Sequence, residues 1–374
     1  MFNVQSSLFL HLLRCALWDE KPDMSLFEGG ADWQGIMEKA FRHTVQGLVA
    51  QQVKHIAETQ DNETLVQACM KVMMQTSMSN QKVNDVLVAL AQAMQRCRFH
   101  AMLLKGQGVA RYYTQPALRV CGDIDCYTGS QTDAITDRLA REMPGFEVKE
   151  EGNRAKHRNA EVGGIEIELH YHVFSPSDAK IAALVDEWSN DELAHRTRQI
   201  EVGGQQLSVP SATFDAIYIF IHFYFHFLKE GVGLRQVCDW LRCLHVCRDE
   251  IDHDEVRRWL KAFGLLHAWQ LFGLMAVRHL GLPQEEMPLY RDRRRRAADK
   301  LMRMLVAGSN FGKDMRREWE ANQPKHVLAH KWYSLRRYTA FYVPRAHLFP
   351  RQGIPRLLGY YKKSLKQIMN KHEV

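Results

Sequence analysis

The chain has 374 residues, 46% hydrophobic and 25% charged, which is enough for two or three domains and excludes an intrinsically disordered chain. No apolar run reaches the length of a membrane span; the longest, Ile217 to Leu228, has about a dozen residues and contains two histidines. The eight cysteines form no CxxC pair and no disulfide framework, and the N-terminus lacks the features of a signal peptide. These features favour a reducing cytoplasm.

The net charge of +7 is concentrated at the C-terminal end. From Lys325 onward there are eleven Lys or Arg residues and one acidic residue, Glu373, whereas the preceding 324 residues carry 39 basic and 42 acidic side chains. Such a basic tail fits contact with a polyanion such as RNA or with an anionic membrane surface, and it equally fits a solvated helical face.

Residues 1–97 are predicted to form an N-terminal helical region. Apolar residues recur there at three-and-four spacing, as in Leu10, Leu13 and Leu17, and again between residues 83 and 94. No group of chemically active side chains stands out in this region. We expect it to pack against a sheet or to present an acceptor substrate.

Residues 98–210 change to short β-like runs. Two Gly-Gly pairs, at 163–164 and 203–204, mark hairpins, and residues 133–142 are predicted to form a helix. The expected strands are Ala101–Leu104, Ile124–Tyr127, Phe146–Glu150, Asn159–Val162, Ile165–Val173 and Ile200–Val202. This mixture predicts a small α+β sheet with helices on one face.

Residues 211–374 are predicted to form a C-terminal helical domain with the basic tail. Ser211 after Pro210 is typical of a helix N-cap at a boundary. The expected helices include Ile217–Leu228, Leu234–Val246, Asp254–Phe263, Ala268–Leu280, Arg294–Val306 and Arg356–Asn370. Pro344, Pro350 and Pro355 are expected to break the tail into short pieces.

The stretch from Met102 to Tyr127 carries the strongest chemical signal. Asp123 and Asp125 are two residues apart on an expected strand, so their carboxylates share one face roughly 7 Å apart. A divalent cation relieves the repulsion between such carboxylates, and oxygen ligands suit Mg²⁺ or Mn²⁺. The Lys105-Gly106 turn precedes an expected helix, whose free N–H groups favour an anion. Phosphate binding followed by metal binding indicates nucleotide chemistry, although a solvated strand end is the simpler alternative.

Glu168 is the candidate for a third metal-binding carboxylate. Apolar residues alternate from Ile165 to Leu169, so Glu166, Glu168 and His170 share the other face of the strand. Glu168 is expected to complete the metal site or to act as a general base, with Glu166 as the second choice. A solvent-facing strand, with His170 as a structural histidine, is the alternative.

Three blocks of residues resemble a known family. The first comprises Leu104, Lys105, Gly106, Tyr113, Pro116, Arg119, Gly122, Asp123 and Asp125; the second is Ile167-Glu168-Leu169-His170; the third is Gly233-Leu234-Arg235-Gln236 with Cys238-Asp239-Trp240. Together they resemble the uncharacterised bacterial nucleotidyltransferases of the DNA polymerase β-like superfamily, over roughly residues 40 to 345. The wider superfamily has Gly-Ser where this chain has Lys105-Gly106.

The resemblance implies a polymerase β-like core flanked by helical regions and a Mg²⁺-dependent transfer of a nucleoside monophosphate from a nucleoside triphosphate to a hydroxyl group. Asp123, Asp125 and Glu168 would hold the metals. The residues expected at the nucleotide are Lys105, Gly106, Arg119, Gly122, His170, Arg235 and Asp239. The acceptor stays open among a sugar, another small molecule, RNA and a protein side chain.

Several of these residues have simpler alternatives. Arg119 either neutralises phosphate or pairs with a carboxylate. Arg235 and Asp239 are four residues apart, so a salt bridge between them is the default expectation. His222 and His226 have metal-ligand spacing, but their aromatic surroundings favour packing or contact with the nucleotide. The competing function is a non-catalytic nucleotide- or RNA-binding module that uses the basic tail.

Overall fold

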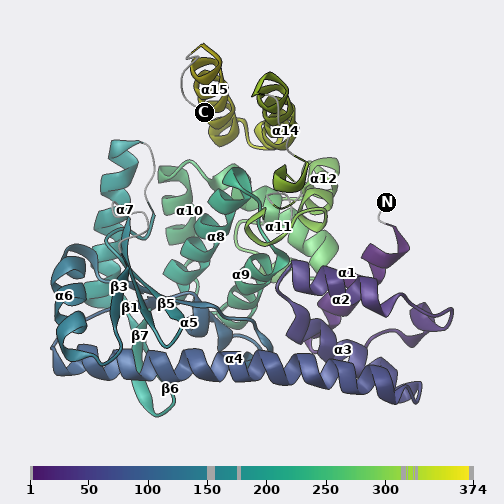
Figure 1. Ribbon diagram of the computed structural model, residues 1–374, viewed down its shortest axis with the longest axis horizontal. Helices are drawn as coiled ribbons and strands as arrows, with labels where there is room; N and C mark the ends of the chain where they lie inside the picture. Colours follow the sequence, from purple (N-terminus) through teal and green to yellow (C-terminus); the bar gives the residue numbers. More distant parts are fainter. Residues whose placement is uncertain are drawn as a thin grey trace.

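One long helix, α4 (Glu63–Arg96), runs beneath the whole molecule and joins its two halves (Figure 1). Its 34 residues span about 51 Å at the usual rise of an α-helix. The computed structural model describes residues 3–149, 156–174, 178–312 and 327–369, together with residues 317, 319–322 and 324. The sheet lies over one end of α4, and the N-terminal helices lie over the other.

Most of the N-terminal helices begin with a side-chain cap, but the helix that follows Val45 has none. They are α1 (Val4–Trp18), α2 (Trp33–Arg42) and α3 (Gln46–Thr59). Asn3 accepts a hydrogen bond from the backbone N–H of Ser6, and Asn62 accepts one from Leu65 at the start of α4. Such caps satisfy N–H groups that have no partner within the helix. The predicted helical character of this region is confirmed.

The sheet has five strands in the order β1-β2-β5-β4-β3. They are β1 (Met102–Leu104), β2 (Asp123–Tyr127), β3 (Glu147–Lys149), β4 (His157–Val162) and β5 (Ile165–His170). The β2–β5 pair is parallel and the other pairs are antiparallel. The α+β class expected from the sequence is therefore confirmed.

A separate hairpin comprises β6 (Arg198–Val202) and β7 (Gln205–Val209). The sequence analysis predicted a strand within β6 but none at β7. The Gly-Gly pairs at 163–164 and 203–204 form the two hairpin turns as expected, and all four glycines have positive φ. The fifth strand ends at His170, three residues earlier than predicted.

One face of the sheet is apolar and the other is charged. Ile124 and Ile167 pack against Leu87 of α4 and against Leu139 of α6 (Thr132–Glu142) in a common core. Because side chains alternate along a strand, this packing turns the carboxylates of β2 and β5 to the opposite face. That face is the one nearest to α8 (Ala212–Lys229).

The C-terminal helices share a second hydrophobic core with α1, α2 and α3. Phe220 of α8 contacts the rings of Trp240, Trp269 and Phe272 in neighbouring helices. The remaining helices are α5 (Gly106–Ala110), α7 (Ala179–Asp191), α9 (Leu234–Val246), α10 (His253–Ala262), α11 (Leu266–Leu280), α12 (Arg295–Val306), α14 (Val327–Leu348) and α15 (Pro350–Met369).

The prediction that prolines divide the tail into short pieces is wrong for Pro344 and Pro355, whereas the break between α14 and α15 does fall at Pro350. Pro344 lies inside α14, and Pro355 lies inside α15, which begins at Pro350. Proline is tolerated at the first helical position because that N–H has no helical partner. Near Pro344, Phe349 stacks on Phe272 with ring centroids 5.8 Å apart. This packing holds the end of α14 on the core. Lys325, Asn370, Lys371 and Glu373 lie outside the described residues.

The basic tail is partly used inside the fold. Arg345 is buried, and the guanidinium of Arg356 lies 5.4 Å from the centre of the Phe225 ring. All eight cysteines are free. Among the described helices, none is both long enough and apolar enough to cross a membrane.

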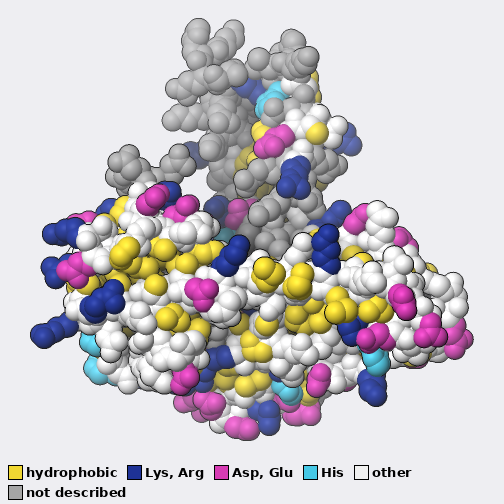
Figure 2. All heavy atoms as spheres, turned by 60° about the horizontal axis from the view of Figure 1, so that its bottom comes forward, with side chains coloured by type: hydrophobic (Ala, Val, Ile, Leu, Met, Phe, Trp, Pro, Cys, Tyr) yellow, Lys and Arg dark blue, Asp and Glu magenta, His cyan; other side chains and the backbone are white. Residues whose placement is uncertain are grey.

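Figure 2 shows the face of the molecule that carries α4. Basic and acidic side chains are interspersed there, with hydrophobic side chains between them, and no continuous basic patch crosses this face of the described part of the chain. Three exposed methionines one helical turn apart, Met70, Met74 and Met78, contribute apolar surface to α4. This face does not have the charge pattern of a nucleic-acid-binding surface.

Candidate active site

The charged face of the sheet collects four carboxylates on two neighbouring strands. In the parallel β2–β5 pair, Asp123 lies opposite Glu166 and Asp125 lies opposite Glu168. Asp125 is 1% exposed, whereas the Glu168 side chain is 22% exposed and Glu166 is exposed. This register therefore places Asp123, Asp125 and Glu168 on one face of the sheet, as predicted.

Asp125 contacts two basic side chains through the same oxygen. The Lys105 ammonium lies 3.0 Å from Oδ1, and Nε2 of His170 lies 2.9 Å from it. Burial acts to raise the pKa of Asp125, but Lys105 and His170 hold it well below its usual range. Its second oxygen, Oδ2, is buried and has no hydrogen-bond partner in the described structure.

The donor set fits a divalent cation. The Asp125 charge, together with burial, raises the pKa of Asp123; burial and the Glu168 charge raise the pKa of Glu166. Like charges that lie this close together on one face repel each other. A cation between the carboxylates would remove that repulsion and would give the buried Oδ2 of Asp125 a partner. Oxygen donors of this kind suit Mg²⁺ or Mn²⁺.

His157 on β4 is a site residue that the sequence analysis missed. It lies opposite His170 in the β4–β5 hairpin, and its Nδ1 is 3.5 Å from Oε2 of Glu168. Nε2 of His170 lies 3.2 Å from the same oxygen. Potential ligand atoms of His157, Glu168 and His170 all lie within 4.8 Å of one another. Counting back from the Gly163-Gly164 turn would have placed His157 opposite His170.

Lys105 occupies the sharp turn between β1 and α5. Its φ of +43° is rare for a residue with a side chain, and Gly106 follows with φ of +50°. A Cβ atom at Gly106 would lie 3.3 Å from the carbonyl oxygen of Asp123, so glycine allows α5 to begin close to β2. The turn directs the Lys105 ammonium at Asp125 and at Nε2 of His222, which is 2.9 Å away.

His222 forms the wall of the site opposite the sheet. Burial and the Lys105 charge hold its pKa well below its usual value, so the neutral ring accepts a hydrogen bond from the ammonium. Its ring centre is 4.6 Å from that of His226, whose Nδ1 is 2.6 Å from Oε1 of Glu230. These contacts show the two histidines bound to Lys105 and Glu230, which fits the packing alternative better than a zinc site.

Arg119 and Asp239 bind each other in a buried, bidentate pair. The guanidinium donates to both Asp239 oxygens, at 3.0 and 2.6 Å, and the Tyr113 hydroxyl donates to Oδ1 at 2.8 Å. The expected salt bridge between Arg235 and Asp239 is therefore wrong, because Arg119 occupies the carboxylate. Arg235 instead donates to the Val120 carbonyl at 2.7 Å.

A small cavity brings most of the predicted residues together. Its lining includes Lys105, Gly106, Arg119, Asp123, Asp125, His222, Arg235, Gln236 and Asp239. Glu168 and His170 approach Asp125 from β5, and Gly122 lies exposed just before β2. The lining therefore combines the carboxylates of Asp123, Asp125 and Asp239 with the cationic side chains of Lys105, Arg119 and Arg235.

A family model described as "uncharacterised nucleotidyltransferase" matches residues 29–281, more than half of the chain. The chain belongs to this nucleotidyltransferase family. The membership is consistent with the polymerase β-like superfamily suggested by the sequence motifs. A search of curated proteins gave no significant match.

Two solved structures are similar to this nucleotidyltransferase. An antigenic nucleotidyltransferase-like protein from Paracoccidioides brasiliensis is 13% identical, with a TM-score of 0.37 over 55% of this chain and 94% of that one. ANT(2″)-Ia, in complex with adenylyl-2″-tobramycin, is also 13% identical, with a TM-score of 0.33 over 49% of this chain and 97% of that one. Both TM-scores are low, so function is inferred from the family and from the site.

Proposed function

We propose that this protein is a divalent-cation-dependent enzyme that transfers a nucleoside monophosphate from a nucleoside triphosphate to a hydroxyl-bearing acceptor. The observation that carries the proposal is the Oδ2 atom of Asp125. It is a buried carboxylate oxygen that has no hydrogen-bond partner among the residues that the structure describes, and it lies next to two further carboxylates. A folded protein leaves such a group unpaired at a substantial energetic cost, which a bound cation would offset.

Asp123, Asp125 and Glu168 would hold the cation. Glu168 is chosen over Glu166 because it lies opposite the buried Asp125 and is contacted by His157 and His170. Mg²⁺ or Mn²⁺, when bound, supplies the positive charge that polarises the phosphate oxygens and the acceptor hydroxyl. His157 and His170 would act as positioning residues for the carboxylates.

The reaction forms a bond between the acceptor oxygen and the α-phosphorus. The bond from that phosphorus to the bridging oxygen breaks, and pyrophosphate leaves. The hydroxyl proton passes to a carboxylate of the charged face, and Glu166 has the raised pKa that suits a base. Lys105 and Arg235 also line the cavity, and their charges favour a triphosphate.

The proposal places the reaction in the cytoplasm, which the eight free cysteines support. The reaction class is tested by comparing nucleotides labelled at the α- or the γ-phosphorus, with Mg²⁺ and an extract of small metabolites as the source of acceptor. We expect α-label in a new product and release of pyrophosphate, both lost in Asp123→Asn and kept in Asp137→Asn, which changes an exposed helix residue. Transfer of the γ-label instead would contradict the proposal.

A further inference from the structure

The helix α12 and the loop before it carry a dense group of basic side chains. Between Arg291 and Arg303 there are seven Lys or Arg residues and two acidic residues. This segment follows the part of the chain that matches the family model, and it precedes the basic tail that begins at Lys325. It is therefore a concentration of positive charge separate from both.

Both acidic residues of this segment already bind other side chains. Arg295 donates to Asp292, with its Nε atom 2.8 Å from Oδ1. Oδ1 of Asp299 lies 3.1 Å from the Arg278 guanidinium and 2.8 Å from Nε2 of His279, which both belong to α11. The two carboxylates therefore balance little of the remaining positive charge.

Five basic side chains of the segment form no ion pair with any residue that the structure describes: Arg291, Arg293, Arg296, Lys300 and Arg303. The four arginines are exposed, and Lys300 is partly exposed. Like charges three and four positions apart on a helix repel each other. An anion that contacts several of these side chains at once would relieve that repulsion.

Arg296, Lys300 and Arg303 form a basic stripe on one face of α12, because residues three and four positions apart lie on the same side of a helix. The opposite face, which includes Leu301 and Leu305, is buried in the helical core. The stripe spans about 10 Å along the helix axis. Over that length, one strand of a nucleic-acid helix carries about three phosphates. The number and spacing of the cations therefore suit a phosphodiester backbone.

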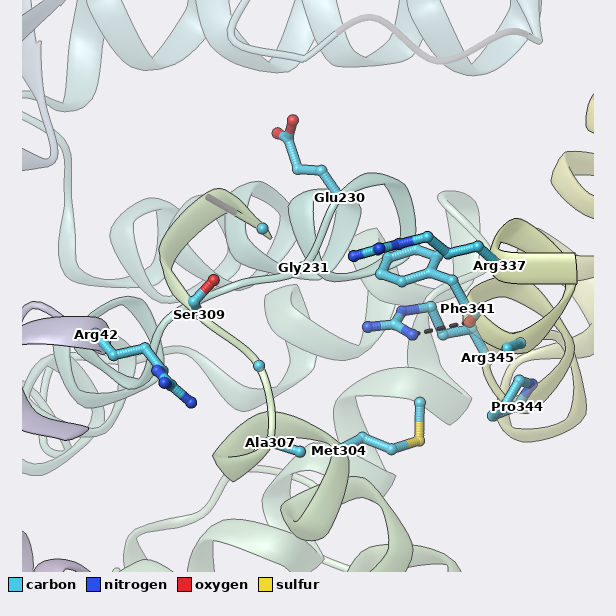
Figure 3. A pocket seen from close by; sticks show the side chains of 13 residues that line it. Arg42, Glu230, Gly231, Met304, Ala307, Ser309, Arg337, Phe341, Pro344 and Arg345 are labelled. Carbon is cyan, nitrogen blue, oxygen red and sulfur yellow. Dashed lines mark hydrogen bonds between the residues drawn. The ribbon is translucent and has the colours of Figure 1, made fainter. Parts of the chain in front are cut away.

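No exposed large hydrophobic side chain accompanies the basic stripe. In the described part of the chain, none lies between Val246 and Trp332. Met304 of α12 and Ala307 just after it line a neighbouring cavity, and no residue of the stripe lines that cavity (Figure 3). A helix that binds a membrane surface places apolar side chains among the lipids. The stripe therefore suits a nucleic acid better than a membrane.

We propose that the basic stripe binds the phosphodiester backbone of a single-stranded nucleic acid, with Arg291 and Arg293 adding positive charge before its first residue. A single line of cations fits one strand, and the planar guanidinium matches the oxygens of a phosphate. Contacts of this kind depend on salt and not on base sequence. The proposal does not depend on nucleotidyl transfer, because no residue of the stripe lines the cavity of the candidate active site.

The test measures binding of fluorescein-labelled oligouridylate to the full chain by fluorescence anisotropy, over a series of NaCl concentrations with EDTA present. Oligothymidylate of the same length distinguishes DNA from RNA. Polyglutamate and vesicles of phosphatidylglycerol serve as competitors that represent an acidic protein and a membrane. We expect at least one of the two oligonucleotides to bind, and neither competitor to displace it at an equal concentration of negative charge.

The variant Arg296→Gln/Lys300→Gln/Arg303→Gln removes the stripe. We expect its affinity for the oligonucleotide to fall by about tenfold or more at low salt. The slope of log K against log salt should become shallower by about 2, because each phosphate contact of a single strand contributes roughly 0.7. The melting temperature should stay close to that of the wild type, since these side chains lie on the face of α12 opposite the core.

Arg257→Gln/Arg258→Gln/Lys261→Gln on α10 is the matched control. It removes the same number of positive charges from exposed positions of another helix. Arg257 and Arg258 have carboxylate partners, Asp254 and Glu255, so they are not available to phosphates in the same way. We expect this control to bind the oligonucleotide as the wild type does.

The basic tail is the competing location for a nucleic-acid contact. Arg336→Gln/Arg351→Gln/Lys362→Gln removes three of its exposed charges and should leave binding unchanged. The proposal is overturned if the wild type binds neither oligonucleotide, or if polyglutamate or the vesicles displace it. It is also overturned if the stripe variant binds as the α10 control does, or if the tail variant loses more affinity than the stripe variant.

Discussion

Two buried aspartates of this protein are used in opposite ways. Asp239, at the junction of the sheet region and the helices, is 5% exposed; Arg119 contacts both of its oxygens, and Tyr113 adds a third hydrogen bond. Asp125, on the charged face of the sheet, is 1% exposed. One of its oxygens contacts Lys105 and His170, and the other has no hydrogen-bond partner in the described structure.

The difference indicates a structural role for Asp239 and supports the chemical role proposed for Asp125. Around Asp239 the charges are matched, so the pair fixes the loop before β2 against α9. Around Asp125 further carboxylates lie on the same face, and the repulsion raises the pKa of Asp123. Functional sites are where proteins keep charges that the fold alone does not balance. The predictions below test this distinction through stability and through binding.

The largest effect on stability is expected from Arg119→Met, which leaves the Asp239 carboxylate buried and unpaired. We expect a loss of about 3–5 kcal/mol in the free energy of unfolding, measured by urea denaturation. The double variant Arg119→Met/Asp239→Leu should recover most of this loss because no buried charge remains. A single variant as stable as the wild type would contradict a structural role for the pair.

When no divalent cation is present, substitutions of Asp125 and Asp123 should affect the free energy of unfolding differently. Both effects should be smaller than that of Arg119→Met. Asp125→Asn removes the charge that Lys105 and His170 contact, so we expect a loss of about 1–3 kcal/mol in the free energy of unfolding. Asp123→Asn removes a like charge beside Asp125 and should leave stability unchanged or slightly higher. Urea denaturation in EDTA measures both, and equal losses would remove the distinction between the two carboxylates.

His157→Gln tests the positioning role of the histidine that faces Glu168. We expect the affinity for Mn²⁺ to fall by about 10- to 100-fold, because residues that orient a metal ligand typically have effects of this size. The free energy of unfolding should change little, since the imidazole is only partly buried. Metal affinity unchanged from the wild type would show that Glu168 does not need His157.

The smallest effect is expected at an exposed ion pair. Arg138 and Glu142 form such a pair on α6, with side chains 52% and 35% exposed. Arg138→Ala should cost less than about 1 kcal/mol, because solvent screens the interaction. A loss as large as that of Arg119→Met would mean that burial does not decide the value of an ion pair in this protein.

The local patterns of the sequence predicted much of the fold and the shared face of the carboxylates. The helix from Leu234 to Val246 has the predicted bounds, and the alternation from Ile165 to Leu169 placed Glu168 on the face that it occupies. The spacing of Asp123 and Asp125 predicted their shared face, because the period of two is a local property of a strand.

The remaining features depend on packing between distant segments. Arg119 lies 120 positions before Asp239, and Lys105 lies 117 positions before His222. No periodicity encodes such pairs, and the local spacing of Arg235 and Asp239 predicted the wrong partner. The helix break predicted at Pro344 is absent, because contacts of α14 with the core stabilise a helix that the local sequence disfavours.

The most direct test of the central claim is calorimetric titration with ATP, CTP, GTP and UTP, with and without Mg²⁺. It compares the wild type with Asp123→Asn and with the surface control Asp137→Asn. The account predicts that at least one nucleotide binds to the wild type and the control only with Mg²⁺, and that Asp123→Asn loses this binding without losing stability. Nucleotide binding by Asp123→Asn equal to that of the wild type would contradict the assignment of the charged sheet face as the metal and nucleotide site.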